Sequence, residues 1–280
     1  MKSLLLATLA TLSLNAFSQS YLIMDNGITI TTDSSGYSYD FGHYAFPQKV
    51  TLKGGQYFVE EGGILATIDE KGLLFRKYEL IPEKIKGKGI NYFLSEEGFM
   101  YTIDSKGFVK VTENALYQKA VNFGGTYFTV AASEEDPTLI DLYVVTSEGL
   151  VQKAEVPSLK VKDIISFGGN YFMNNRGIVY TVAADGMVNP RDEMRVGIIN
   201  KKGGNFFVDS SGYFFTVSAV TGELQMPALP VNLRVSSILK MGSNYFLDQS
   251  GKLYVVDKHG QVFERVMRDH DFRNARIISL

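Results

Sequence analysis

Short apolar runs separated by polar, glycine-rich turns recur along the whole chain. In one segment the runs lie at residues 49–52, 56–60, 63–68 and 72–78, with glycines between them. Runs this short, bounded by Gly and Asp, are typical of antiparallel strands joined by tight turns. Apolar residues do not recur at the helical spacing of about 3.6 residues, and glycine is too frequent for helices. The pattern therefore predicts an all-β protein.

A spacing rule connects these strands: an aromatic residue, a glycine six residues later, and then Asp-x-x-Gly. Tyr57, Gly63, Asp69 and Gly72 meet the rule in full. Asp at the first position of a turn accepts backbone hydrogen bonds, and Gly at the fourth takes a left-handed conformation. Seven copies, some with an insertion or a substitution, follow at steps of 35 to 44 residues and begin at Tyr21, Tyr57, Tyr92, Tyr127, Tyr171, Phe206 and Tyr245. A period of this length predicts a repeat architecture.

The strands are apolar on nearly every residue, as at 64–68 and 178–182. Such strands indicate sheets buried on both faces, which a blade between two neighbouring blades satisfies. The chain therefore resembles a β-propeller, and its seven copies imply a seven-bladed β-propeller of four-stranded antiparallel blades. The double glycines at 54–55 and 124–125 resemble those of kelch repeats, and residues 251–257 are similar to strands of NHL and quinoprotein-type propellers. No single propeller family is implied.

The two ends of the chain predict how the ring closes. The first copy begins at Tyr21, in the second strand of a blade, so the first strand of that blade is missing. Residues 275–280 are similar in pattern to the first strand at 164–167. We predict that this C-terminal strand completes the first blade and closes the ring. The alternative is an open solenoid, which leaves sheet edges exposed.

The first residues are typical of a secretory signal peptide. Lys2 precedes an apolar run at residues 4–14, and small residues surround a cut after Ser18. The run is shorter than the roughly 20 apolar residues of a membrane span. We predict a signal peptide over residues 1–18, one propeller domain over residues 19–280 without a transmembrane segment, and a periplasmic or secreted protein. Since the chain has no cysteine, burial and ring closure must stabilise it in place of disulfides.

The balance of charge excludes one class of partner. The sequence has 28 Lys and Arg, 30 Asp and Glu, and a formal net charge of −2. A nucleic-acid-binding protein would present a strongly basic face, so we predict no nucleic-acid partner. The aromatic content of 12% comes from Tyr and Phe without Trp, which suits wide packed sheet faces.

An insertion interrupts the fourth copy between its second and third strands, at residues 131–139. Loops on a rigid scaffold often carry function, and this loop contains Glu134, Glu135 and Asp136. We therefore select these three acids as candidate binding residues for a basic partner or a cation. Their spacing does not match a calcium loop. The alternative is a solvated, variable turn.

The last connector between blades, at residues 265–276, is rich in arginine. Guanidinium groups bind carboxylates and phosphates well, so Arg268, His270 and Arg273 are candidate residues for an anion site. The alternative is that Asp269 and Asp271 pair with these arginines and leave an ordinary polar loop.

Residues for catalysis or metal binding are scarce in the sequence. The three histidines, His43, His259 and His270, are scattered, and a zinc site needs three or four convergent ligands. No Gly-x-Ser-x-Gly motif provides a serine nucleophile. The repeated aspartates are explained by turns, and the paired aromatics by packing between blades. We predict no metal and no cofactor.

These observations favour an exported, non-catalytic β-propeller that acts as a protein-binding or scaffold module in the bacterial cell envelope. Its expected partner is another envelope or extracellular protein. One alternative is a propeller enzyme of the lyase, lactonase or glycosidase type, in which acids converge at the channel; glycoside cleavage needs two carboxyl groups at a defined separation. Another alternative is a carbohydrate-binding propeller with a glycan partner, which predicts equivalent pockets in several blades.

Overall fold

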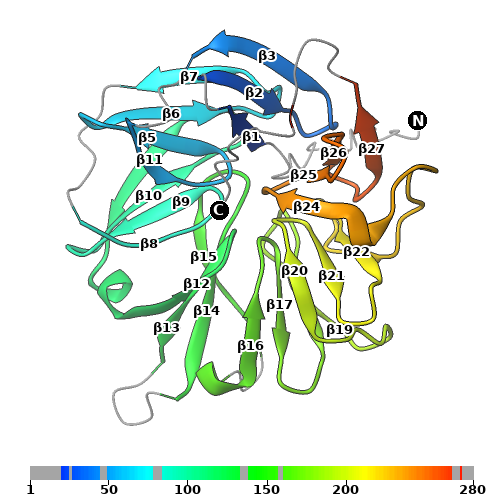
Figure 1. Ribbon diagram of the computed structural model, residues 1–280. Helices are drawn as coiled ribbons and strands as arrows, with labels where there is room; N and C mark the ends of the chain where they lie inside the picture. The colour runs from blue at the N-terminus through cyan, green and yellow to red at the C-terminus, as the bar shows by residue number, and fades with distance from the viewer. Residues whose placement is uncertain are drawn as a thin grey trace, which may run out of the picture.

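The computed structural model describes residues 20–24, 27–44, 49–77, 84–132, 138–156, 160–266 and residue 272. Within them the chain forms seven antiparallel sheets, one of three strands and six of four. Figure 1 shows these sheets around a common centre, with β3 and β27 at the rim. The arrangement confirms the predicted seven-bladed β-propeller.

The blades follow one another in chain order. Blade 1 has β1 (Ser20–Ile23), β2 (Ile28–Thr32) and β3 (Ser38–His43). Blade 2 has β4 (Val50–Lys53), β5 (Tyr57–Glu60), β6 (Ile64–Ile68) and β7 (Leu74–Lys77). Blade 3 has β8 (Ile85–Lys88), β9 (Tyr92–Ser95), β10 (Phe99–Ile103) and β11 (Val109–Glu113). Blade 4 follows the 3-10 helix η2 (Ala115–Lys119) and has β12 (Ala120–Phe123), β13 (Tyr127–Ala131), β14 (Ile140–Val145) and β15 (Val151–Ala154).

The remaining three blades repeat this plan. Blade 5 follows η3 (Val161–Asp163) and has β16 (Ile164–Phe167), β17 (Tyr171–Asn174), β18 (Val179–Val182) and β19 (Val188–Arg191). Blade 6 has β20 (Ile199–Lys202), β21 (Phe206–Asp209), β22 (Phe214–Val217) and β23 (Leu224–Gln225). Blade 7 follows η4 (Val235–Ser237) and has β24 (Ile238–Met241), β25 (Tyr245–Asp248), β26 (Leu253–Val256) and β27 (Val262–Arg265). No helix in the described part of the chain is both long and apolar enough to span a membrane.

The repeated aromatic at the start of each second strand joins its blade to the next. These side chains are almost completely buried, and each ring for which a contact is given lies about 5 to 6 Å from an aromatic ring of the next blade, as Tyr92 does from Phe128. The hydroxyl groups also connect the blades: that of Tyr57 donates to the carbonyl of Tyr92 at 2.8 Å, and that of Tyr92 to the carbonyl of Tyr127 at 2.6 Å. The series continues from Tyr127 to Tyr171 and from Tyr171 to Phe206. The aromatics fill the spaces between blades, as the repeat predicts.

Because neighbouring strands are antiparallel, the turn between the first and second strands and the turn between the third and fourth strands lie at the same end of the ring, here called the turn end. At this end the glycine-rich first turns contact one another. Ile90 donates its N–H to the carbonyl of Gly125 at 2.6 Å, and Gly125 donates to Gly168 at 3.0 Å. An added Cβ at Gly125 would lie 2.3 Å from the Cα of Gly169. Only glycine permits this close approach of two backbones.

The third-to-fourth-strand turns form a second, complete ring. Ser34 donates its N–H to the carbonyl of Glu70 at 3.2 Å, and Lys258 in blade 7 donates to the carbonyl of Ser34 at 2.9 Å. One residue of each blade takes part, and each donates to the next; the members are Ser34, Glu70, Ser105, Ser147, Ala184, Val220 and Lys258. Seven backbone hydrogen bonds therefore return to their starting point and hold every blade against both neighbours.

The first and last blades also pack directly together. Leu22 and Ile30 of blade 1 share one hydrophobic cluster with Tyr245 and Val255 of blade 7. These contacts close the ring within the described residues. The predicted closing strand, residues 275–280, lies outside them, so its role remains a prediction.

Candidate functional site

The candidate residues in both loops that the sequence analysis selected lie outside the described residues. The residues concerned are Glu134, Glu135, Asp136, Arg268, His270 and Arg273. The first loop leaves and re-enters the sheet where predicted, because Ala132 donates its N–H to the carbonyl of Leu139 at 2.9 Å, between β13 and β14. The six site residues remain predictions.

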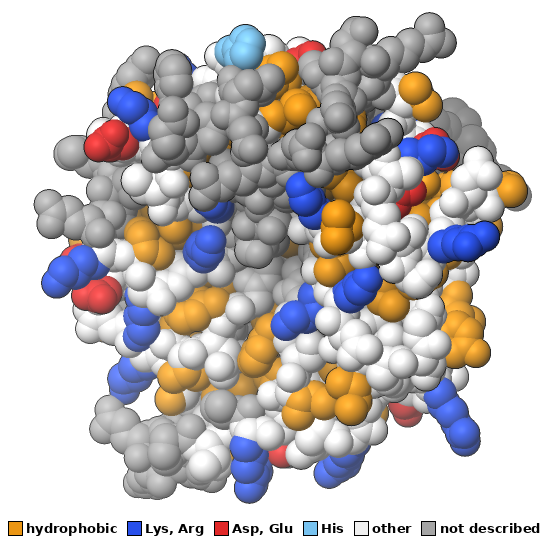
Figure 2. Space-filling view, viewed as in Figure 1, with side chains coloured by type: hydrophobic (Ala, Val, Ile, Leu, Met, Phe, Trp, Pro, Cys, Tyr) orange, Lys and Arg blue, Asp and Glu red, His pale blue; other side chains and the backbone are white. Residues whose placement is uncertain are grey.

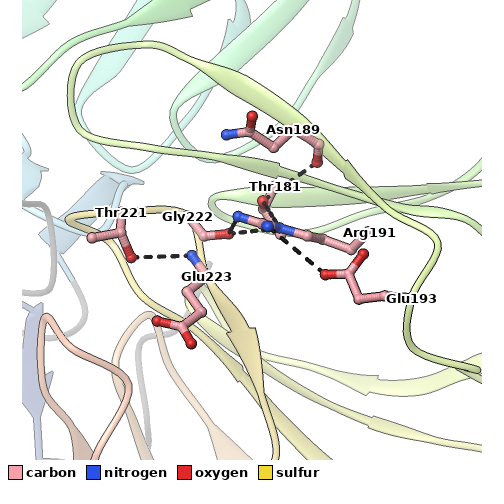
Figure 3. Close-up of polar contacts among 7 residues, drawn as sticks. All are labelled: Thr181, Asn189, Arg191, Glu193, Thr221, Gly222 and Glu223. Atoms are coloured by element: carbon pink, nitrogen blue, oxygen red, sulfur yellow. Dashed lines mark hydrogen bonds and ion pairs between the residues drawn. The ribbon is translucent and has the colours of Figure 1, made fainter.

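The one described arginine of the last connector, Arg265, joins two blades. Its Nε donates to the carbonyl of Gly36 at 2.5 Å, and its guanidinium lies 5.2 Å from the centre of the Tyr37 ring. Arg191, the last residue of β19, has the same position in blade 5. Its guanidinium donates to the carbonyl of Gly222 in blade 6, from Nη2 at 2.8 Å and from Nε at 3.2 Å (Figure 3). Both arginines thus hold the turn between the third and fourth strands (the third turn) of the next blade, which is a structural role.

The described residues include no group of three or more His, Asp or Glu side chains that could hold a metal ion. His259 lies in a turn, where its carbonyl accepts a hydrogen bond from the side chain of Gln225 at 2.6 Å. The repeated aspartates act as predicted: Oδ1 of Asp69 accepts the N–H groups of Lys71 at 3.0 Å and Leu73 at 2.8 Å. These aspartates form turns.

Positive charge is concentrated on the first strands of the blades. The described first strands contain six lysines and no acid, although the whole chain has a net charge of −2. These lysines are Lys53, Lys86, Lys88, Lys201, Lys202 and Lys240. On the face shown in Figure 2, Lys and Arg side chains lie around the centre, while Asp and Glu lie mostly toward the rim. A centre of one sign of charge attracts ligands of the opposite sign.

A cavity of about 300 Å³ lies among the ends of these strands. Blades 3 to 7 each contribute the last residue of the first strand and the glycine that follows it, so the cavity is on the axis of the ring, at the turn end. It is lined by Lys88, Phe123, Phe167, Lys202 and Met241 and by the glycines that follow each of them. Cavities of roughly 300–1,000 Å³ are typical of small-ligand sites.

Lys88 is the most constrained of the cavity lysines. Its Nζ donates to the carbonyl of Lys53 in the neighbouring blade at 2.6 Å. Burial lowers the pKa of Lys88 from its usual value, and the nearby charge of Lys53 lowers it further. A partly dehydrated ammonium group beside a second cation gains more from a bound anion than an exposed lysine does. Lys202, across the cavity, is exposed, and its ammonium group makes no hydrogen bond or ion pair with the described part of the chain.

The remaining cavity walls are apolar and aromatic. Phe123 and Phe167, from adjacent blades 4 and 5, line the side between the two lysines, and Met241 lines the other side. Lysine binds an anionic group as a point charge rather than through a planar fork. The cavity can therefore hold a group that carries negative charge at one point and apolar surface next to it, such as an acidic side chain with its methylene groups.

Comparisons with known proteins add little to this geometry. The chain matches no model of a known protein family, and it matches no curated protein. Among solved structures, it is similar to virginiamycin B lyase from Staphylococcus aureus, with 13% identity, a TM-score of 0.34 and coverage of 90% of this chain and 89% of the other. It is also similar to BamB from Moraxella catarrhalis, with 13% identity, a TM-score of 0.27 and coverage of 88% and 81%. At TM-scores below 0.5 neither likeness carries a conclusion about function.

Reasoning from the sequence missed this cavity, because it placed the candidate residues in the loops at the opposite end of the ring. A usable signal is nevertheless present. When the copies are aligned on the glycines that follow each first strand, the preceding position holds Lys53, Lys88, Phe123, Phe167, Lys202 and Met241. Three of the residues at this aligned position are cations and none is an acid. That composition indicates a site for an anion once the structure shows that the position faces the axis of the ring.

Proposed function

We propose that the protein is an exported, non-catalytic propeller of the bacterial cell envelope that binds another protein through the cavity at its turn end. The observation that supports this proposal most directly is the cavity lined by Lys88 and Lys202 on first strands that carry six lysines and no acid. The group that the cavity would receive is a carboxylate on the partner, with its apolar stem against Phe123 and Phe167.

Export is supported by the N-terminal pattern of the sequence. A cut after Ser18 leaves Gln19 as the first residue of the mature protein, directly before β1. Expression with the native N-terminus in a Gram-negative host, followed by fractionation and N-terminal sequencing, tests this part of the proposal. We expect mature protein beginning at Gln19 in the periplasm or the medium. Uncut protein retained in the cytoplasm would contradict it.

Fluorescence anisotropy with short labelled peptides that contain one Glu tests the binding site. We expect a Lys88→Met/Lys202→Met variant to bind such a peptide more weakly by about tenfold for each lysine removed, because a hydrogen bond to a charged group contributes about 1.5–3 kcal/mol. The matched control is Lys162→Met, since Lys162 is an exposed lysine in η3, at the other end of the ring. A Glu→Gln peptide should bind the native protein as weakly as the Glu peptide binds the double variant.

Inorganic phosphate and free glutamate serve as competitors in the same assay. Displacement of the peptide by glutamate at concentrations where phosphate has no effect favours a carboxylate ligand. Displacement by phosphate alone would contradict the proposed carboxylate. Equal binding by the native protein and the double variant would show that the cavity is not the binding site.

A further inference from the structure

Large apolar side chains are exposed at one repeated position of the turn end. The residue that follows the glycine of the third turn is Tyr37, Leu73, Phe108, Leu150 or Met187 in blades 1 to 5. The exposed fractions are 62% for Tyr37, 45% for Leu73, 60% for Phe108, 51% for Leu150 and 59% for Met187. Single exposed apolar residues are common on protein surfaces, but a continuous row of them marks an interaction site. These five residues are called the apolar arc.

The fold does not require apolar residues at this position. In blades 6 and 7 the equivalent residues are Glu223 and Gln261, and both are exposed. The turns of these blades belong to the same ring of backbone hydrogen bonds, and their glycines Gly222 and Gly260 have positive φ like those of the other blades, although the turn of blade 6 is one residue longer. The apolar arc is therefore a property of one sector of the ring, blades 1 to 5, and turn formation does not explain it.

The turns that carry the arc are joined from blade to blade and lie at the same end of the ring as the cavity. The third turns of neighbouring blades are directly hydrogen-bonded, for example Glu70 to Ser105 at 2.7 Å. The ammonium group of Lys77 in blade 2 lies 5.2 Å from the centre of the Phe108 ring in blade 3, so a cation of one blade contacts the arc residue of the next. The cavity opens among the first turns at the same end. One end of the propeller thus has a cationic centre and an apolar border along five of its seven blades.

We propose that the apolar arc and the cavity together form a docking surface for a protein segment in which an acidic residue is flanked by apolar residues. The acidic side chain enters the cavity between Lys88 and Lys202, and the flanking apolar side chains cover the arc. This inference rests on the proposed function, and it adds the chemistry of the partner and the sector of the ring that the partner covers. The complementary charges and the position of the arc beside the cationic centre are the observations that support it.

A lipid surface is a poorer match than a protein segment. The turns that carry the arc hold exposed acids at Glu148 and Asp185 and exposed lysines at Lys71 and Lys106, so their exposed charges balance. An anionic bilayer therefore finds no excess of positive charge along the arc. A protein segment needs only one acidic group, located at the axis, and can place neutral or basic residues opposite the turns.

A pair of labelled peptides tests the inference by fluorescence anisotropy. Both contain a central Glu, which is flanked by Leu in one peptide and by Ser in the other. We expect the Leu-flanked peptide to bind the native protein about tenfold more tightly, because covering each half-exposed apolar side chain stabilises the complex by about 1 kcal/mol or more. In a Phe108→Ser/Leu150→Ser variant the two peptides should bind with similar affinity. The matched control is Tyr213→Ser, since Tyr213 is 58% exposed but lies at the opposite end, in the turn between the second and third strands.

The outcomes separate this inference from the proposed function. If the two peptides bind the native protein equally and both depend on Lys88 and Lys202, the apolar arc is not part of the site, and the inference is overturned while the proposed function stands. If neither peptide depends on the two lysines, the proposed function fails. Binding to vesicles of phosphatidylcholine with phosphatidylserine, without binding to either peptide, would assign the surface to a lipid and overturn both. Circular dichroism and thermal melts of each variant establish that the fold is retained.

Discussion

The chain of tyrosine hydroxyl groups between blades predicts a specific loss of stability when one hydroxyl is removed. The change is Tyr92→Phe, which keeps the ring that packs against Phe128 and removes only the oxygen. The hydroxyl of Tyr92 donates to the carbonyl of Tyr127 at 2.6 Å and lies 3.0 Å from the carbonyl of Gly124. Blade 3 would therefore lose its hydrogen bond to blade 4 at this point.

The expected size of the loss follows from the partners that remain. The carbonyl of Tyr127 also accepts the N–H of Gly124 at 2.8 Å, so it keeps one hydrogen bond in the variant. The change then costs about 1 kcal/mol, the typical net contribution of one buried hydrogen bond, rather than the larger penalty of an unpaired buried group. For a domain of this size, 1 kcal/mol lowers the melting temperature by about 2–4 °C.

Chemical denaturation followed by circular dichroism measures the change. The conservative control is Tyr213→Phe, since the hydroxyl of that exposed residue does not join two blades in the described structure. A second arm is Phe206→Tyr, which places a hydroxyl in blade 6 where the pattern has none. We expect it to donate to the carbonyl of Tyr245 and to raise stability by about 1 kcal/mol. Equal midpoints for the native protein and Tyr92→Phe would refute the idea that these hydroxyls join the blades.

Three further predictions concern other contacts between neighbouring blades. Burial raises the pKa of six tyrosines above the usual value near 10, so above that pH the folded state keeps protons that the unfolded state has lost. The stability that these tyrosines contribute is therefore complete below about pH 10 and falls above it by up to about 1.4 kcal/mol per pH unit for each tyrosine. Urea midpoints measured against pH check this, and a midpoint that does not change above pH 10 would contradict it. These residues are Tyr21, Tyr57, Tyr92, Tyr127, Tyr171 and Tyr245. Gly125→Ala forces a Cβ to within 2.3 Å of the Cα of Gly169, so we expect a loss of about 1–3 kcal/mol or more in thermal melts, against no change for Ser211→Ala in an exposed turn. Arg265→Met removes the hydrogen bond to Gly36 and the contact with Tyr37. We expect the free energy of unfolding, measured by chemical denaturation, to fall by about 1–3 kcal/mol. Full stability of this variant would show that the arginine does not hold blades 7 and 1 together.

The fold could be predicted from the sequence because its repeat specifies turns and buried strands locally. Asp69 and Gly72 mark one turn, and the structure has the aspartate accepting backbone hydrogen bonds and the glycine at a φ of 76°. Each such rule involves residues close together in the chain, so periodicity alone shows it. The number of copies then gives the number of blades, since every blade needs a neighbour on both faces.

The cavity could not be predicted in the same way, because its residues come from five blades that are distant in the sequence. Nothing local to Lys88 or Phe167 shows that their strands end at the axis. The choice of the two irregular loops followed a general expectation that variable loops carry function, and the cavity is instead formed by the most regular part of each blade. The hydroxyl contacts between Tyr92 and Tyr127 were missed for the same reason: packing between blades was expected, but the register of one blade against the next cannot be read from the repeat.

The cavity and the apolar arc at the turn end differ from the rest of the fold because their side chains do not follow the sevenfold symmetry of the repeat. Seven identical blades would offer a partner seven equivalent orientations, and no single complex would be favoured. Here the backbone hydrogen bonds of the third turns keep the sevenfold pattern, while the side chains beside them do not. The apolar arc covers blades 1 to 5, and Glu223 and Gln261 interrupt it in blades 6 and 7. The cavity likewise has its two lysines in blades 3 and 6 and its two phenylalanines in blades 4 and 5. In the proposed docking, a segment that satisfies both features has one favoured orientation, which is set by side-chain differences while the hydrogen-bond ring of the third turns stays sevenfold.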